Sequence, residues 1–179
     1  MSTACDNLTG GITLGCDNNV GGLKRLWFLE SSFVTSVSLS SPAETISAIN
    51  TTGSPAASFH EFIFNKGNAN YVENQTSDQA TGRDLYEQTV TLTLNRREKS
   101  KRDVLILMGN RKDYVAIAED NNGNVWYLGE TYGLNLTTNS GGSGAQKTDA
   151  NQYVVTFVAQ EPNPANTLTA AAYAAVCAL

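Results

Sequence analysis

The sequence predicts a mainly β protein, an antiparallel β-sandwich or barrel with one short flanking helix. One observation is Leu85–Asn95, where apolar and polar residues alternate as they do along a half-buried strand. Another is the pair of apolar runs Tyr114–Ala118 and Val125–Leu128, because the Asn121-Asn122-Gly123 turn between them is typical of a hairpin. The third is composition, since charged residues make up only 16% of the chain. A chain of 179 residues is long enough for one domain.

Two strands are predicted at the start of this domain. Leu23–Leu29 is a largely apolar run, and Phe33–Leu39 alternates until Ser41-Pro42 interrupts it. One face of the second strand comprises Phe33, Thr35, Val37 and Leu39. Ser58–Asn65 is rich in Phe and is also predicted to be a strand, in which His60 has a packing or edge role.

The middle of the chain predicts a loop region, the long strand and a helix. Residues 41–83 are expected to be an insertion or loop region, within which Asn74–Arg83 is a polar connection. One face of the long strand comprises Tyr86, Gln88, Val90, Leu92 and Leu94. The alternation of apolar and polar residues ends there, and Ser100 as cap with Gly109 as stop predicts a short helix at about 99–109. The alternative is that Val104–Met108 alone forms a strand.

Two more strands and an apolar tail are predicted after the hairpin. Tyr132–Thr138 is the first strand, Asn139–Lys147 is a Gly/Ser loop, and Tyr153–Ala159 is the last strand. One face of the last strand comprises Tyr153, Val155, Phe157 and Ala159. The tail, residues 165–179, is rich in Ala and contains no charged side chain, so we expect it to dock on its own core or on a neighbouring subunit.

The charge of the chain is distributed unevenly. Seven of the 12 basic residues lie between Arg96 and Lys112, a window with two acidic residues, which leaves about −10 on the remainder. An acidic body argues against a general nucleic-acid-binding surface, because phosphates are repelled from it. The basic segment is expected to be a solvated face or a docking site for an acidic neighbour, with nucleic-acid contact as the alternative.

The sequence offers no residues for catalysis, for a cofactor or for a metal, and we assign none. Cys5–Gly11 is echoed eleven residues later by Cys16–Gly22, but a structural zinc site needs four Cys or His ligands and the only histidine, His60, is distant. The echo is therefore interpreted as a Gly-rich turn used twice. No Ser/His/Asp set has a meaningful spacing, so the protein is not expected to be an enzyme.

The three cysteines, Cys5, Cys16 and Cys177, are predicted to be free thiols. The chain opens without an apolar stretch of signal-peptide length, and no run approaches the roughly 18–20 apolar residues that span a bilayer. We therefore expect synthesis in a reducing cytoplasm and no contact with a membrane.

Several motifs give the chain a resemblance to a known family. They are Gly21–Leu26, the strand 85–95 with the helix after it, and the runs 115–123, 126–129, 133–137, 153–157 and 161–164. In these motifs the chain resembles structural proteins of tailed bacteriophages, in particular tail tube (major tail) or tail-ring proteins from phages of Bacteroidetes-type hosts. The resemblance is best over about 85–164, and residues 41–83 and the tail after Pro164 depart from the pattern.

The resemblance implies a tail-tube-like fold and a virion role, with assembly in the bacterial host cytoplasm. Subunits would form hexameric rings, twelvefold in some connector relatives, around a channel through which genomic DNA passes without sequence-specific binding. The expected partners are further copies of the chain and neighbouring tail or neck proteins, with no small-molecule ligand. An acidic lumen would repel DNA and let it slide.

We expect the chain to divide into three parts. Residues 1–22 would be an N-terminal arm, 23–164 a β core, and 165–179 a C-terminal arm. Rings would stack through long loops and terminal arms. By hypothesis, residues 41–83 and 139–148 make contacts between subunits or between rings. The basic segment 96–102 would meet an acidic neighbour. The alternatives are another virion component (neck or connector, baseplate, fibre or capsid decoration) and a stand-alone β-barrel module or enzyme.

Overall fold

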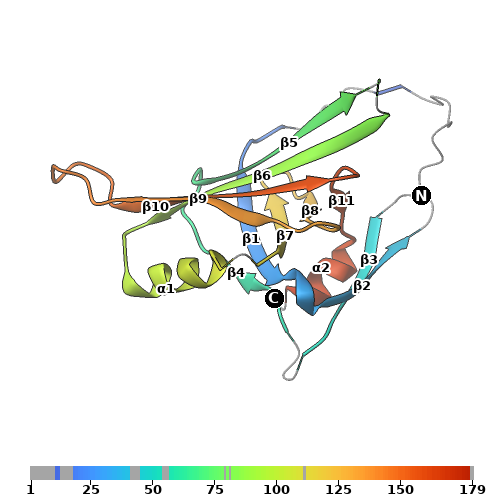
Figure 1. Cartoon of the computed structure of the whole chain (residues 1–179), viewed down its shortest axis with the longest axis horizontal. Coiled ribbons are helices and arrows are strands. Elements are labelled where there is room, and N and C mark those ends of the chain that lie inside the picture. The colour runs from blue at the N-terminus through green and yellow to red at the C-terminus, as the bar shows by residue number, and fades with distance from the viewer. Residues whose placement is uncertain are drawn as a thin grey trace.

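Two antiparallel sheets form the body of the protein, which confirms the predicted mainly β, sandwich-like fold (Figure 1). The computed structural model describes residues 11–12, 18–40, 45–53, 57–78, 80, 82–110 and 112–177. The strands are β1 (Leu23–Glu30), β2 (Val34–Ser40), β3 (Thr45–Thr51), β4 (His60–Glu61), β5 (Ala69–Asp78), β6 (Arg83–Asn95), β7 (Tyr114–Asp120), β8 (Val125–Leu128), β9 (Asn135–Gly142), β10 (Gln152–Glu161) and β11 (Asn166–Thr167). One sheet has the order β11-β8-β7-β1-β4, the other β5-β6-β10-β9, and β2 and β3 form a separate hairpin.

The main core lies between the two sheets. Strands β6 and β10 pair over ten residues without a bulge, so their alternation is kept in register and one face of each is buried. The inward faces predicted for both strands are confirmed, because Val90, Leu92, Val155 and Phe157 are fully inaccessible. They meet Leu26, Phe28, Ala116, Ala118 and Leu128 from the five-stranded sheet.

A second apolar cluster lies on the other face of the five-stranded sheet. Trp27 of β1 and Ile117 of β7 point into it, and Ile46 of β3 covers them. Strands β1 and β7 are therefore buried on both faces, which is why their sequences are apolar runs without alternation.

The C-terminal segment docks on its own chain and contains a second helix, α2 (Ala170–Val176). The prediction of one helix was therefore incomplete. Thr169 caps α2 by accepting a hydrogen bond from the Ala172 amide, and Ala172 packs into the second cluster. The Tyr173 ring meets Trp27 edge-on with centroids 5.2 Å apart, and its hydroxyl donates to Glu119 over 2.7 Å.

A buried carboxylate fixes the loop between β8 and β9. Glu161, at the end of β10, is 2% exposed and accepts hydrogen bonds from the amides of Thr131, Tyr132 and Gly133 at 2.9, 2.9 and 3.2 Å. Because each of these amides has found its acceptor, the loop is anchored without secondary structure of its own.

The predicted loop region 41–83 is wrong over much of its length. It holds β3, β4 and β5, and Asn74–Asp78, which the sequence predicts to be part of a polar connection, is the second half of β5. In contrast, only His60–Glu61 of the predicted strand 58–65 pairs with a neighbour. His60 lies in this edge strand, which agrees with the edge role predicted for it.

Three further predictions need correction. Bulges in the β2-β3 pairing shift the faces of β2, so Val34 and Val37 pack on the second cluster while Leu39 is 51% exposed. The predicted loop 139–147 begins only after Gly142, the last residue of β9. Helix α1 (Lys99–Met108) has Glu98 rather than Ser100 at its N-cap position, and the Glu98 side chain accepts no capping hydrogen bond.

Candidate binding groove

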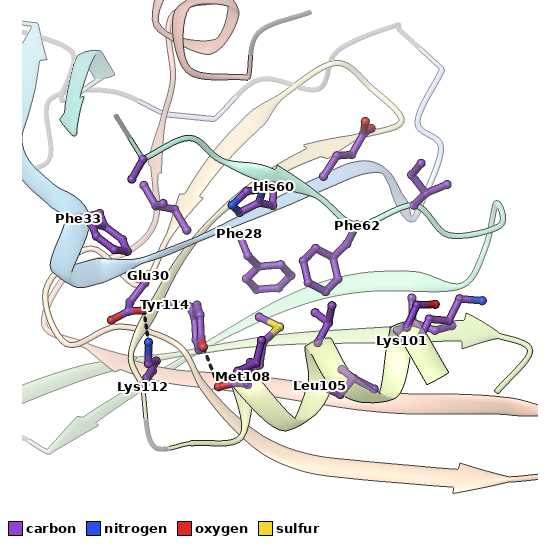
Figure 2. Close-up of a pocket in the computed structure, with 18 residues that line it drawn as sticks. Phe28, Glu30, Phe33, His60, Phe62, Lys101, Leu105, Met108, Lys112 and Tyr114 are labelled. Carbon is purple, nitrogen blue, oxygen red and sulfur yellow. Dashed lines mark hydrogen bonds and ion pairs between the residues drawn. The ribbon is translucent and has the colours of Figure 1, made fainter. Parts of the chain in front are cut away.

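A groove of about 770 Å³ lies beside helix α1 (Figure 2). The helix forms one wall, the end of β1 supplies Phe28 and Glu30, and the chain around β4 supplies His60 and Phe62. Segments far apart in the sequence therefore meet here, because the topology places β4 next to β1 at the edge of the five-stranded sheet.

The floor of the groove is aromatic and rigidly packed. Phe28 and Phe62 contact each other edge-on with ring centroids 4.9 Å apart, and Phe28 also lies 4.6 Å from Phe157 in the core. Leu105 and Met108 of α1 are buried against this floor, and Tyr114 donates its hydroxyl proton to the Leu107 carbonyl at 3.4 Å. The groove is thus continuous with the main core rather than separated from it.

Helix α1 leaves part of its apolar surface uncovered. Its second half is five apolar residues in a row, Val104–Met108, but a helix packed along one stripe buries only positions three or four apart. Leu105 and Met108 occupy the buried stripe, whereas Leu107 is 63% exposed at the groove. On the opposite wall Ile63 is 82% exposed. Apolar side chains that line a groove and face water are typical of a contact surface.

Polar groups lie at the rim. The Lys112 ammonium donates to Glu30 at 2.6 Å, which lowers the pKa of the Glu30 carboxyl and raises the pKa of Lys112. At the other end Ser100 and Lys101 join the groove to the basic segment 96–102. The groove therefore has an apolar floor, a neutral ion pair on one side and cations at one end.

The basic segment is partly neutralised within the chain. Glu98 contacts Arg96 and Lys101 at 3.1 and 3.7 Å, and Asp103 contacts Lys99 at 2.6 Å. Residues 96–103 still hold five basic and two acidic side chains, so they carry a net charge of about +3. This segment therefore has the positive charge expected of a docking site for an acidic neighbour. The acidic neighbour itself stays a prediction.

The groove offers a surface for binding rather than a recognisable set of reacting groups. It contains one imidazole, His60, and the hydroxyl of Ser100. Among the described residues, no hydrogen bond joins either side chain to a second base or to a carboxylate. Within the described ranges, no three His, Cys, Asp or Glu side chains converge as a metal site requires. Of the cysteines, Cys177 is a buried free thiol, and Cys5 and Cys16 lie outside the described residues.

The sequence did not predict the groove. The usable signal was the run Val104–Met108, which is too apolar for a helix with one packed face. The sequence predicts a packing or edge role for His60, but nothing in it places this residue beside α1.

Comparison with protein-family models, curated proteins and solved structures found no match to this chain. No helix in the described part of the chain is long and apolar enough to cross a membrane.

Proposed function

We propose that this protein is a virion structural subunit that builds the tail tube or a tail ring of a tailed bacteriophage by oligomerising around a DNA channel. The observation that carries the proposal is the four-stranded sheet β5-β6-β10-β9. Within the part of the chain that the structure describes, this sheet has two open edges, and its outward face carries almost no charge.

The open edges suit joining to further copies. Among the described residues β5 pairs only with β6, and β9 only with β10. An unpaired edge strand is a template for another strand, and a ring of sheets removes such edges. Neighbouring strands are about 4.8 Å apart, so the four strands of one copy would contribute about 19 Å to the circumference of a ring. A ring of six copies would then have a circumference of about 115 Å and a diameter of about 37 Å, measured at the backbone. Side chains about 5 Å deep would leave a lumen of about 27 Å, which is wide enough for a DNA duplex.

The outward face of the sheet suits a channel through which DNA slides. It alternates with the buried face and presents Thr89, Thr91, Thr93, Val154, Thr156 and Val158. The four strands contain a single basic residue, Arg83, at the start of β6. Because cationic side chains supply most of the affinity for phosphates, DNA would find few partners on this face.

This face departs from the expected acidic lumen. Along the central stretch of β6 and β10 it carries one carboxylate, Glu87, among Thr, Val and Gln. If it lines the channel, DNA slides because binding groups are missing, and repulsion contributes little.

The apolar groove favours a second candidate, a stand-alone binding module. A groove of about 770 Å³ is within the size range of sites for small molecules. This candidate predicts a monomer that binds an apolar ligand.

The first test is the mass and shape of the purified protein, measured by light scattering on a sizing column and by negative-stain microscopy. Rings or tubes with a central hole support the proposal. A 19 kDa monomer at high concentration would refute it and favour the binding module.

A second test concerns the basic segment. Charge reversal at Arg97, Lys99 and Lys101 should weaken assembly most at low salt, because contacts between exposed charges are screened within about 10 Å at 0.1 M salt. If assembly were unchanged at every salt concentration, the segment would have no part in the contact.

A further inference from the structure

We propose that the groove beside α1 receives residues 8–14 of the N-terminal arm of a second copy of this chain. The inference rests on the proposed function in one respect: it requires that copies of the chain assemble. It goes beyond that function by assigning a particular contact.

The arm has the apolar pattern that the groove requires. In Leu8–Leu14 the residues at alternate positions are Leu8, Gly10, Ile12 and Leu14, so an extended segment places its three apolar side chains on one face. The groove presents a complementary apolar floor, bounded by the exposed Ile63 and Leu107. Covering Leu107 and Ile63 would remove two of the most exposed large apolar side chains of the body from water.

The charges of the arm and the groove are opposite. Residues 1–22 contain two acidic side chains, Asp6 and Asp17, and no basic one. These aspartates bracket the apolar residues, and Lys101 at one end of the groove belongs to the segment 96–103, whose net charge is about +3. An acidic, apolar segment therefore matches this groove better than a neutral or basic one does.

The arm leaves its own body at the far end from the groove. Asn19, Val20 and Gly21 are fixed on the β7-β8 turn, where the Asn122 side chain bonds to Asn19 and to the Val20 amide at 3.1 and 2.8 Å. The Asn121 amide group also donates to the Gly21 carbonyl at 2.8 Å. This anchor precedes the start of β1, whereas the groove is formed at the end of β1, about 20 Å further along the strand.

The described pair Gly11–Ile12 lies away from α1, on the side where β5 ends and β6 begins (Figure 1). Ile12 is fully exposed, so its own body gives it no cover. A groove on a neighbouring copy supplies the cover that its own chain lacks. The second half of the N-terminal echo, Asn18–Gly22, then acts as the anchor from which the first half extends.

The test is a disulfide between two different chains. All preparations of the chain used in this test carry Cys5→Ser and Cys16→Ser, so that the buried Cys177 is the only native thiol left. One preparation then carries Ile12→Cys and the other, with a different tag, carries Leu107→Cys. The two are mixed under assembly conditions and oxidised, and a two-chain product bearing both tags is sought on a non-reducing gel. Leu39→Cys, at another apolar position that is more than half exposed and lies outside the groove, replaces Leu107→Cys in the control.

A mixed-tag product with Leu107→Cys and none with Leu39→Cys supports the inference. Ile12→Ser should in addition raise the protein concentration needed for half-assembly by roughly tenfold or more, because it removes an aliphatic side chain from the contact. Val104→Cys, also at the groove, repeats the cross-link if Leu107→Cys perturbs the fold.

Two outcomes overturn the inference and leave the proposed function standing. In one, rings form but neither groove cysteine cross-links to the arm. In the other, a chain carrying both Ile12→Cys and Leu107→Cys closes its disulfide within itself at high dilution, which shows that each arm fills its own groove. Failure to self-associate at any concentration would refute both the inference and the proposed function.

Discussion

Glu161→Gln should destabilise the protein far more than its conservative chemistry suggests. The two carboxylate oxygens of Glu161 accept three backbone hydrogen bonds, Oε2 from Thr131 and Oε1 from Tyr132 and Gly133. A glutamine side chain has one carbonyl oxygen, so its NH2 group would face at least one amide that is also a donor. The substitution therefore leaves at least one partly or fully buried amide without an acceptor and weakens the remaining bonds, which lose a charged acceptor.

The expected size of this effect follows from the count of bonds. A buried unsatisfied amide costs about 1–3 kcal/mol, and a charge-assisted hydrogen bond is roughly twice as strong as a neutral one. Together these give a loss of about 3 kcal/mol, a large part of the 5–15 kcal/mol by which domains are typically stable. With a urea dependence of about 2 kcal/mol/M, the unfolding midpoint should fall by about 1.5 M.

Urea unfolding followed by Trp fluorescence measures this shift. Gln160→Ala, at the neighbouring exposed position of β10, is the matched control and should change the free energy of unfolding by less than about 0.5 kcal/mol. A Glu161→Gln midpoint within the error of the control would refute the reasoning, because it would mean that the loop amides find water instead of needing the carboxylate.

Three more predictions concern the core, the C-terminal helix and a turn. Phe157→Ala should cost about 3–5 kcal/mol and lower Tm by about 10 °C, because the ring is fully buried and lies 4.6 Å from Phe28; calorimetry measures this, with exposed Tyr132→Ala as control. Burial raises the pKa of Glu119, but hydrogen bonds from Lys24 and Tyr173 outweigh it and hold the pKa below its usual 4.5. A carboxyl group whose pKa is lower in the folded than in the unfolded protein stabilises the fold at pH values above its unfolded pKa. This contribution is lost as the pH falls through the pKa of the folded protein. Glu119→Gln should therefore lower the urea midpoint at pH 7 and make its decline from about pH 5 to pH 3 shallower; an unaltered decline would contradict this role. Gly129 has φ of 71°, and an added Cβ would lie 2.8 Å from the Tyr114 carbonyl oxygen, whereas Gly123 has φ of 88° with open space around it. Gly129→Ala should thus be clearly more destabilising than Gly123→Ala, for which only the backbone strain of about 1–2 kcal/mol applies, and equal losses in urea titrations would count against the clash.

The parts of the fold that the sequence predicted well are those with a contrast between two faces. In Val90–Leu94 of β6 and Tyr153–Ala159 of β10 the inward residue at every second position is apolar, because one side of each strand meets the core and the other does not. The β7-β8 hairpin was predictable for a different reason, since its Asp120–Asn124 turn needs residues that accept tight backbone geometry.

The failures have equally local causes. The far half of β5, Asn74–Asp78, extends beyond the core and pairs with β6 residue by residue, so it needs no apolar pattern. The end of β9 is glycine because the Tyr153 ring covers it, and a Cβ on Gly141 would lie 2.8 Å from that ring. Both stretches resemble loops in composition, while their strand character comes from the partner strand.

The groove was beyond sequence reasoning because it depends on the meeting of α1 with the chain around β4. Phe62 provides the clearest case: it lies just outside the paired residues of β4, and its side chain packs on Phe28. A Phe-rich stretch predicts a strand, but only the tertiary fold decides that these rings form the floor of a groove.

The long separation between β1 and β7 has a consequence for synthesis. Leu26 pairs with Ala118, which lies roughly ninety residues later in the chain. At about 5–20 residues per second, a ribosome needs about 5–18 s to make the intervening segment, and during that time Leu26–Leu29 has no strand to pair with on that side. A bare Leu-Trp-Phe-Leu strand is prone to aggregate, so expression yield should depend more on elongation rate and holding chaperones than on the stability of the finished fold.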